Sequence, residues 1–174
     1  YYDAKFGLKY PLAKLDQVAL PDFDAGAMEN WGLVTYRESM MLVASDATLF
    51  TKQIVALTVT HELSHQWFGD LVTMEWWDDL WLNESFASIM EYYCTDALYP
   101  DFQIWQKFFT SDCVSALRRD AIPGVQSVHQ EVNNPAEIAT LFDSAIVYSK
   151  GARLVLMLIR LMTPEQFDQG LRDY

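Results

Sequence analysis

The stretch His61-Glu62-Leu63-Ser64-His65 decides how the rest of this 174-residue chain is interpreted. Two histidines at this spacing lie one helical turn apart on the same face, so both imidazoles can bind one zinc ion, and the glutamate between them can reach a water molecule on that metal. A catalytic zinc site also needs a third protein ligand and an open fourth position. Eighteen residues separate His65 from Glu84, enough for the helix to end and a second helix to present a carboxylate. We therefore predict Glu84 as the third ligand.

Composition and charge indicate an acidic globular protein of one domain. The chain is 51% hydrophobic and 14% aromatic, which is typical of a folded core and argues against disorder. Its formal net charge of −12 argues against binding to nucleic acid or to anionic membranes. No apolar run approaches the roughly 18 residues of a membrane-spanning helix. We therefore expect no nucleic-acid partner and no membrane segment in this part of the chain.

The cysteines and the first residues bear on the cellular compartment. Cys94 and Cys113 are too few for a disulfide framework and lack a partner at zinc-site spacing, so both are predicted to be core thiols. The opening Tyr1-Tyr2-Asp3-Ala4-Lys5 has neither the basic head nor the apolar core of a signal peptide. Because the chain does not begin with Met, we expect it to be cut from a longer protein, whose own signal would not be visible here. These features favour a cytoplasmic protein.

The first 44 residues have the composition of strands and turns. β-Branched and aromatic residues between proline and glycine predict strands at 16–20 and 31–36, joined by a loop over 22–30. A further strand is expected at 40–44.

From residue 45 onward the pattern predicts helices. A helix from Thr51 to Phe68 ends at Gly69, and its many β-branched residues indicate a helix held by packing on most sides. Further helices are expected at 78–98, 101–119 and 147–162, with N-caps at Asn134 and Thr163 for two more. A few strands followed by helices predict an α+β fold.

Four motifs together resemble the aminopeptidase N family of zinc metallopeptidases. They are Gly26-Ala27-Met28-Glu29-Asn30, His61-Glu62-x-x-His65, Asn83-Glu84 and Tyr148-Ser149-Lys150-Gly151, in the order and spacing of that family. The resemblance implies a thermolysin-like zincin catalytic domain over residues 1–174, with a β-rich part at 1–44 and a helical part at 45–174. It also implies an adjoining N-terminal β domain and a C-terminal helical domain in the parent chain. The implied activity is hydrolysis of N-terminal residues from peptides with a free N-terminus.

The chemistry of the zinc site suggests a role for each residue. His61 and His65 would bind one Zn²⁺ through neutral imidazole nitrogens and Glu84 through a carboxylate oxygen, and the positive charge of the site lowers the pKa of a bound water. Glu62 is turned about 100° around the helix from its neighbour, so it suits a general base that takes a proton from that water. The resemblance implies the same role for Glu62. It also assigns the donor to the carbonyl oxyanion to Tyr148, a choice among nine tyrosines that the residues alone do not make.

The resemblance assigns substrate binding to the loop at 26–30. A free α-ammonium needs a carboxylate beside the metal, and the family uses the residue at Glu29 for this purpose. Small residues at the start of the loop let its backbone approach a peptide and pair with it like a strand. Just before the loop, a small residue is expected to border a roomy pocket for the first side chain. The other candidate substrate-binding residues are Ala25, Gly26, Ala27, Met28 and Asn30.

The sequence departs from thermolysin-like sites at one position. Those sites often have an Asp four residues after the third ligand, where it orients a histidine, and here that position is Ser88. Asp79 or Asn83 is expected to serve instead. His129 falls in a polar stretch and is predicted to be a surface residue.

Other functions stay open from the sequence. A thermolysin-like endopeptidase would share the metal ligands and Glu62 but has no need for Glu29. An epoxide hydrolase related to this family shares most of the site, although its loop typically carries a second glycine where Ala27 stands. A zinc-stabilised, catalytically weak segment that binds peptides without turnover is the alternative from another class. Comparing a free peptide with its N-acetylated form separates the endopeptidase from the aminopeptidase.

Overall fold

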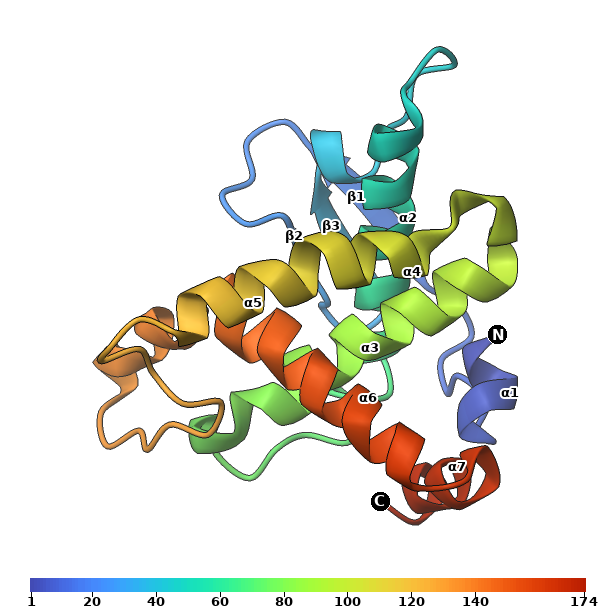
Figure 1. Ribbon diagram of the computed structural model, residues 1–174. Helices are drawn as coiled ribbons and strands as arrows, with labels where there is room; N and C mark the ends of the chain where they lie inside the picture. Colours follow the sequence, from blue (N-terminus) through green and yellow to red (C-terminus); the bar gives the residue numbers. More distant parts are fainter.

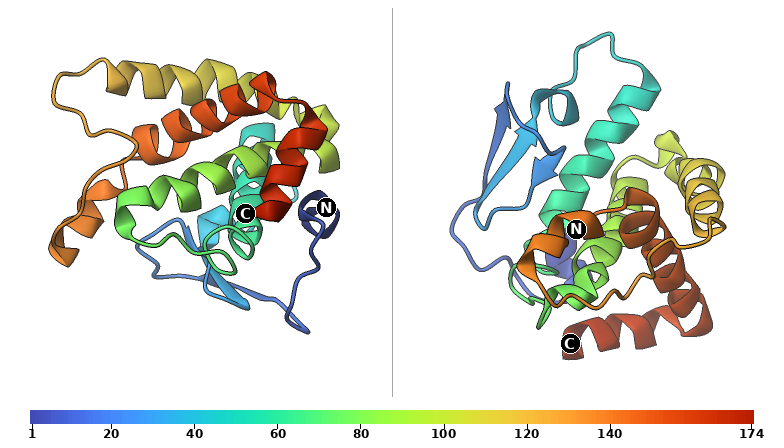
Figure 2. Two further views of the ribbon diagram at one scale, coloured as in Figure 1. Left: turned by 90° about the horizontal axis from the view of Figure 1, so that it is seen from below. Right: turned by 90° about the vertical axis from the view of Figure 1, so that its left-hand side faces the viewer.

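The computed structural model describes residues 1–174, and it has the α+β fold that the sequence predicts. A small sheet stands on one side of helix α2 (Leu49–His65), and most of the other helices lie on the opposite side (Figure 2). The first and last helices, α1 (Tyr2–Phe6) and α7 (Pro164–Asp173), contact each other, with Lys5 Nζ 2.5 Å from Asp168 Oδ1 (Figure 1). None of the helices combines the length and the hydropathy that a membrane span requires.

The sheet has three strands in the order β1–β3–β2. β1 (Asp16–Leu20) runs parallel to β3 (Leu33–Arg37), and β2 (Ala27–Met28) pairs antiparallel with β3. The first predicted strand is therefore confirmed, and the second begins and ends slightly later than expected. β2 falls inside the stretch predicted as a loop, because two residues are too few to show the alternation by which strands are recognised.

The strand expected at 40–44 is wrong. The chain forms a 3₁₀ turn at Glu38–Met40 instead, and the amides of Met41 and Leu42 both donate to the carbonyl of Glu38, at 3.2 and 2.8 Å. These local bonds use the backbone groups that a strand would offer to a neighbour. The apolar residues that suggested a strand remain partly exposed in the connection to α2.

Helix α2 begins two residues before the expected start and ends three residues before the expected end. Thr48 caps it, its hydroxyl oxygen accepting the amide of Thr51 at 3.2 Å. Within the helix the hydroxyl of Thr58 donates to the carbonyl of Ile54 at 3.0 Å, which satisfies a polar group on a largely covered helix. The chain turns sharply after His65 and passes Gly69, whose φ of +131° favours glycine.

The remaining helices follow the predicted order with local irregularities. α3 (Leu80–Leu98) packs against α2 and α6 (Gly151–Leu161), and a π-helical stretch at Ser144–Lys150 leads into α6. α4 (Ile104–Lys107) and α5 (Cys113–Asp120) are joined by a second π-helical stretch into one continuous rod (Figure 1). The capping box at Thr163 is confirmed, and Asn134 caps a 3₁₀ helix at Pro135–Leu141.

The main core lies where α2, α3 and α6 meet. α1 closes one edge of this core, with the ring of Phe6 5.5 Å from that of Trp67. Cys94 and Cys113 are buried free thiols within it, as predicted. The core therefore fixes the end of α2 against the start of α3, which are the two places that carry the candidate metal ligands.

Candidate metal centre and substrate cavity

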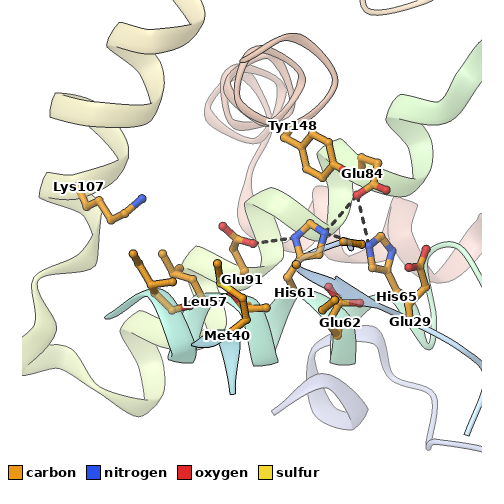
Figure 3. Close-up of a pocket in the computed structure, with 15 residues that line it drawn as sticks. Glu29, Met40, Leu57, His61, Glu62, His65, Glu84, Glu91, Lys107 and Tyr148 are labelled. Carbon is orange, nitrogen blue, oxygen red and sulfur yellow. Dashed lines mark hydrogen bonds and ion pairs between the residues drawn. The ribbon is translucent and has the colours of Figure 1, made fainter. Parts of the chain in front are cut away.

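Three candidate metal ligands converge between α2 and α3 (Figure 3). Nε2 of His61 lies 3.0 Å from Nε2 of His65, and these atoms lie 3.2 and 3.5 Å from Oε2 of Glu84. In a tetrahedral site, zinc bonds of about 2.0–2.1 Å place ligand atoms about 3.3–3.4 Å apart. The triangle therefore has the dimensions that one zinc ion requires, and all three residues are buried.

The hydrogen-bond partner of Nδ1 in each imidazole shows where the ring proton lies, and therefore that the lone pair is on Nε2. Nδ1 of His61 lies 2.7 Å from Oε2 of Glu91, and Nδ1 of His65 lies 2.9 Å from the carbonyl oxygen of Phe68. Both partners are acceptors, so each Nδ1 carries the proton and a neutral ring leaves a lone pair on Nε2. Two lone pairs and a carboxylate then face one point, which is an arrangement that a cation stabilises.

The expectation that Asp79 or Asn83 orients a metal-binding histidine is wrong. Asp79 Oδ1 lies 2.8 Å from Nδ1 of His129, which is exposed as predicted, and Asn83 donates to Glu29. The sequence reasoning missed Glu91, which lies seven residues after Glu84 and hence two turns along the same face of α3. That spacing is a usable signal once Glu84 is taken as a ligand.

Glu62 lies on α2 beside the converging ligands, and its side chain lines the same cavity (Figure 3). The residue is only 6% exposed, and its Oε2 has no hydrogen-bond partner within the protein. Burial raises the pKa of Glu62 to about 7, against the opposing effect of His61 and His65. A buried carboxylate with a free oxygen at the cavity wall can exchange a proton with a molecule in the cavity.

Tyr148 reaches the site from the π-helical stretch before α6, and its ring stacks on His61 at 5.9 Å between ring centres. Burial and the charge of Glu84 raise the pKa of its hydroxyl above the ordinary value, so the group stays a donor. Ser85 supports this stretch by donating to the carbonyl of Val147 at 2.5 Å. Gly151 permits the close approach, because a Cβ there would lie 1.8 Å from Oγ of Ser85.

The segment before β3 also lines this cavity. Ala25, Gly26, Ala27 and Glu29 line the cavity, and one carboxylate oxygen of Glu29 accepts the amide of Asn83 at 3.1 Å. Two loop residues that the sequence associated with substrate do not line this cavity. Met28 is 43% exposed, and Asn30 instead donates to the hydroxyl of Thr35 at 3.0 Å.

The cavity bordered by these groups has a volume of about 400 Å³. One end holds the converging ligands, Glu62 and Tyr148, and the wall beyond them is formed by Met40, Ile54, Leu57, Thr58 and Lys107. The cavity therefore has room for a small molecule beside the converging ligands, and four carboxylates line it, from Glu29, Glu62, Glu84 and Glu91.

Comparison with known proteins places these residues in a family context. The family described as "Peptidase family M1 domain" matches residues 1–174. The chain is 59% identical to the "Aminopeptidase N" of Lactobacillus delbrueckii subsp. lactis over 100% of its own length and 21% of that protein. It is 48% identical to the "Aminopeptidase M1-D" of Oryza sativa subsp. japonica, over 99% of this chain and 20% of the relative. The chain thus spans about a fifth of the length of these curated relatives.

Proposed function

The chain belongs to peptidase family M1, and we propose that it supplies the catalytic machinery of a zinc aminopeptidase that removes N-terminal residues from peptides. The observation that carries the proposal is the position of Glu29, a carboxylate in the cavity that also holds the ligand triangle of His61, His65 and Glu84. A metal alone would serve any peptidase, whereas a separate carboxylate beside it suits a free α-ammonium.

The metal proposed for the triangle is zinc, held by His61, His65 and Glu84. Two imidazole nitrogens and one carboxylate oxygen form a donor set typical of catalytic zinc. Bound zinc would supply a Lewis acid that makes a water more acidic and polarises the carbonyl of the scissile bond. The partly buried carboxylate of Glu91 holds His61 in its ligating orientation.

The protein's own groups then move the proton and hold the substrate. Glu62 takes a proton from the attacking water and passes it to the amine that leaves. The hydroxyl of Tyr148 donates a hydrogen bond to the carbonyl oxygen as negative charge builds on it. Glu29 binds the α-ammonium and so sets which bond is cut. Gly26 and Ala27 are small, so their backbone can pair closely with the substrate. Ala25 leaves space for the first side chain.

The partners proposed are peptides with a free N-terminus. The relatives are about five times longer than this chain, so an N-terminal β domain and a C-terminal helical domain are proposed to adjoin it and complete the cavity. Activity measurements therefore belong in the full-length protein, meaning this chain together with whatever sequence flanks it.

Zinc content gives the first test. The full-length protein should hold one zinc per chain, and Glu91→Ala should weaken zinc binding by about 10- to 100-fold, because His61 loses the acceptor that orients it. Glu84→Ala, which removes a ligand itself, sets the reference for complete loss. Competition with a chelator, read by elemental analysis, measures these affinities. A parental zinc affinity in Glu84→Ala would exclude His61, His65 and Glu84 as the zinc site.

Discrimination between free and blocked amines tests the proposed activity itself. Glu29→Ala should lower kcat/KM for an aminoacyl fluorogenic substrate by about 10- to 100-fold, because a charge-assisted hydrogen bond in a partly dry site contributes about 1.5–3 kcal/mol. The exposed Glu38 on the neighbouring turn provides a matched control, and Glu38→Ala should leave kcat/KM unchanged. If the parent cleaves N-acetylated peptides as fast as free ones, the site is an endopeptidase.

A further inference from the structure

Two carboxamides hold Glu29, and each is the sequence neighbour of a candidate metal ligand. Gln66 directly follows His65 at the end of α2, and Asn83 directly precedes Glu84 near the start of α3. Gln66 bonds to the backbone of Glu29 and Asn83 bonds to its carboxylate. We propose that Gln66 and Asn83 are positioning residues that align Glu29 with the metal centre for recognition of the substrate amine. The inference rests on the proposed function.

Gln66 fixes the backbone of the loop. The side chain is fully buried, and its Nε2 donates to the carbonyl oxygen of Glu29 at 3.0 Å. Its Oε1 accepts the amide of Gly32 at 3.3 Å and lies 3.5 Å from the hydroxyl of Tyr10. One carboxamide therefore bonds to the chain at both ends of the turn into β3, by donating at one end and accepting at the other. A carboxylate at this position could accept but not donate.

Asn83 fixes the carboxylate of the same residue. Its Nδ2 donates to Oε1 of Glu29 at 3.1 Å, and a carboxylate partner requires that the NH₂ end of the amide faces it. The other end, Oδ1, is buried without a partner against Gly69, where a Cβ would lie 2.0 Å from it. No other group of the protein bonds to Oδ1, so the bond to Glu29 is the one that sets the orientation of this amide.

The charge around Glu29 explains why neutral donors are used. Burial and then the charge of Glu29 raise the pKa of Asp70 to about 7, so Glu29 acts on a second carboxyl group. Glu62 and Glu84 belong to the same acidic cavity. A neutral amide can hold the side chain of Glu29 and leave it free to pair with a substrate ammonium, whereas a lysine or arginine would occupy it as an ion pair.

The two amides also link amine recognition to metal geometry. Because Gln66 and Asn83 lie beside His65 and Glu84, the backbone positions that set the ligand triangle also set the position of Glu29. The distance from the ammonium site to the metal is thereby fixed, and with it the peptide bond that reaches the metal. Loss of either amide should affect amine recognition and leave metal binding intact.

The test compares two inhibitors of the full-length protein that differ only in the α-amine. Asn83→Ala and Gln66→Glu should each lower the affinity for the amine-bearing inhibitor by about tenfold. Each substitution removes a hydrogen bond that holds Glu29 in place. Affinity for the amine-free inhibitor and zinc content should stay at parental values. In a Glu29→Ala background, neither substitution should weaken the amine-bearing inhibitor further, because both act through Glu29.

Matched controls remove equivalent bonds elsewhere. Gln126→Glu removes a hydrogen bond that the side-chain amide donates to the carbonyl of Leu141, and Asn133→Ala removes one donated to the carboxylate of Glu131. Both should leave the two affinities unchanged. If Gln66→Glu does not fold, Gln66→Met, which removes the donor at similar volume, replaces it.

The outcomes separate the two proposals. The positioning role would be overturned if the amide variants lost affinity equally for both inhibitors or if they lost zinc. It would also be overturned if their loss of affinity added to that of Glu29→Ala. If Glu29→Ala weakens the amine-bearing inhibitor and the two amide variants do not, only the positioning role fails. If Glu29→Ala itself has no effect on this inhibitor, the proposed amine site fails, and the positioning role fails with it.

Discussion

Replacing Glu62 by glutamine should lower kcat by about 10² or more in the full-length protein while zinc stays bound. The substitution keeps the shape and volume of a buried side chain that is only 6% exposed, so the cavity wall should not collapse. What it removes is the ability to take a proton from the attacking water and return it to the leaving amine. The loss should appear in kcat, measured with an aminoacyl fluorogenic substrate alongside elemental analysis of zinc.

The control for this prediction is a glutamate outside the cavity. Glu137 lies in the exposed 3₁₀ helix before the π-helical stretch, and Glu137→Gln should leave kcat and zinc content at parental values. A Glu62→Gln protein that retains near-parental kcat would exclude Glu62 as the base. Loss of zinc together with activity would instead indicate that Glu62 supports the ligands, since its side chain lies beside both histidines (Figure 3).

The convergence of the three candidate ligands was predictable from the sequence, because helical periodicity turns spacing into proximity. His61 and His65 needed only one regular helix, and Glu84 needed only a second helix to begin after a turn. The capping signals at Thr163 and Asn134 were likewise local, and the structure confirms both. Features that depend only on residues nearby in the sequence could therefore be predicted.

Features that depend on packing between helices and loops could not be predicted in the same way. The carbonyl of Phe68 orients His65 only because the chain turns back after α2, and no side-chain pattern marks a backbone acceptor. Glu91 reaches His61 because α3 packs along α2, so its seven-residue spacing from Glu84 becomes a signal only once Glu84 is taken as a ligand. The expectation for Asp79 failed for the same reason, since its partner His129 lies fifty residues away in the sequence.

The π-helical stretch at Ser144–Lys150 is the clearest case of a site feature that the sequence did not predict. The sequence predicts a regular helix from 147, yet a wider turn holds Tyr148 over His61. A π turn interrupts the regular bonding of a helix, and Ser85 Oγ donates to the carbonyl of Val147 at this place. Because Ser85 adjoins Glu84, the support of this turn comes from the helix that carries a candidate ligand.

Tyr148→Phe should lower kcat by about 10²-fold with little change in KM, because losing one oxyanion donor costs about 3 kcal/mol of transition-state stabilisation. The ring that stacks on His61 is retained, so zinc content should stay parental. Tyr36 provides the matched control: it is buried, its hydroxyl donates to Gln17 at 2.9 Å outside the cavity, and Tyr36→Phe should leave kcat unchanged. The decisive comparison is kcat against KM. A rise in KM alone would make Tyr148 a ground-state binding residue, because an interaction reserved for the transition state cannot change substrate affinity without changing turnover.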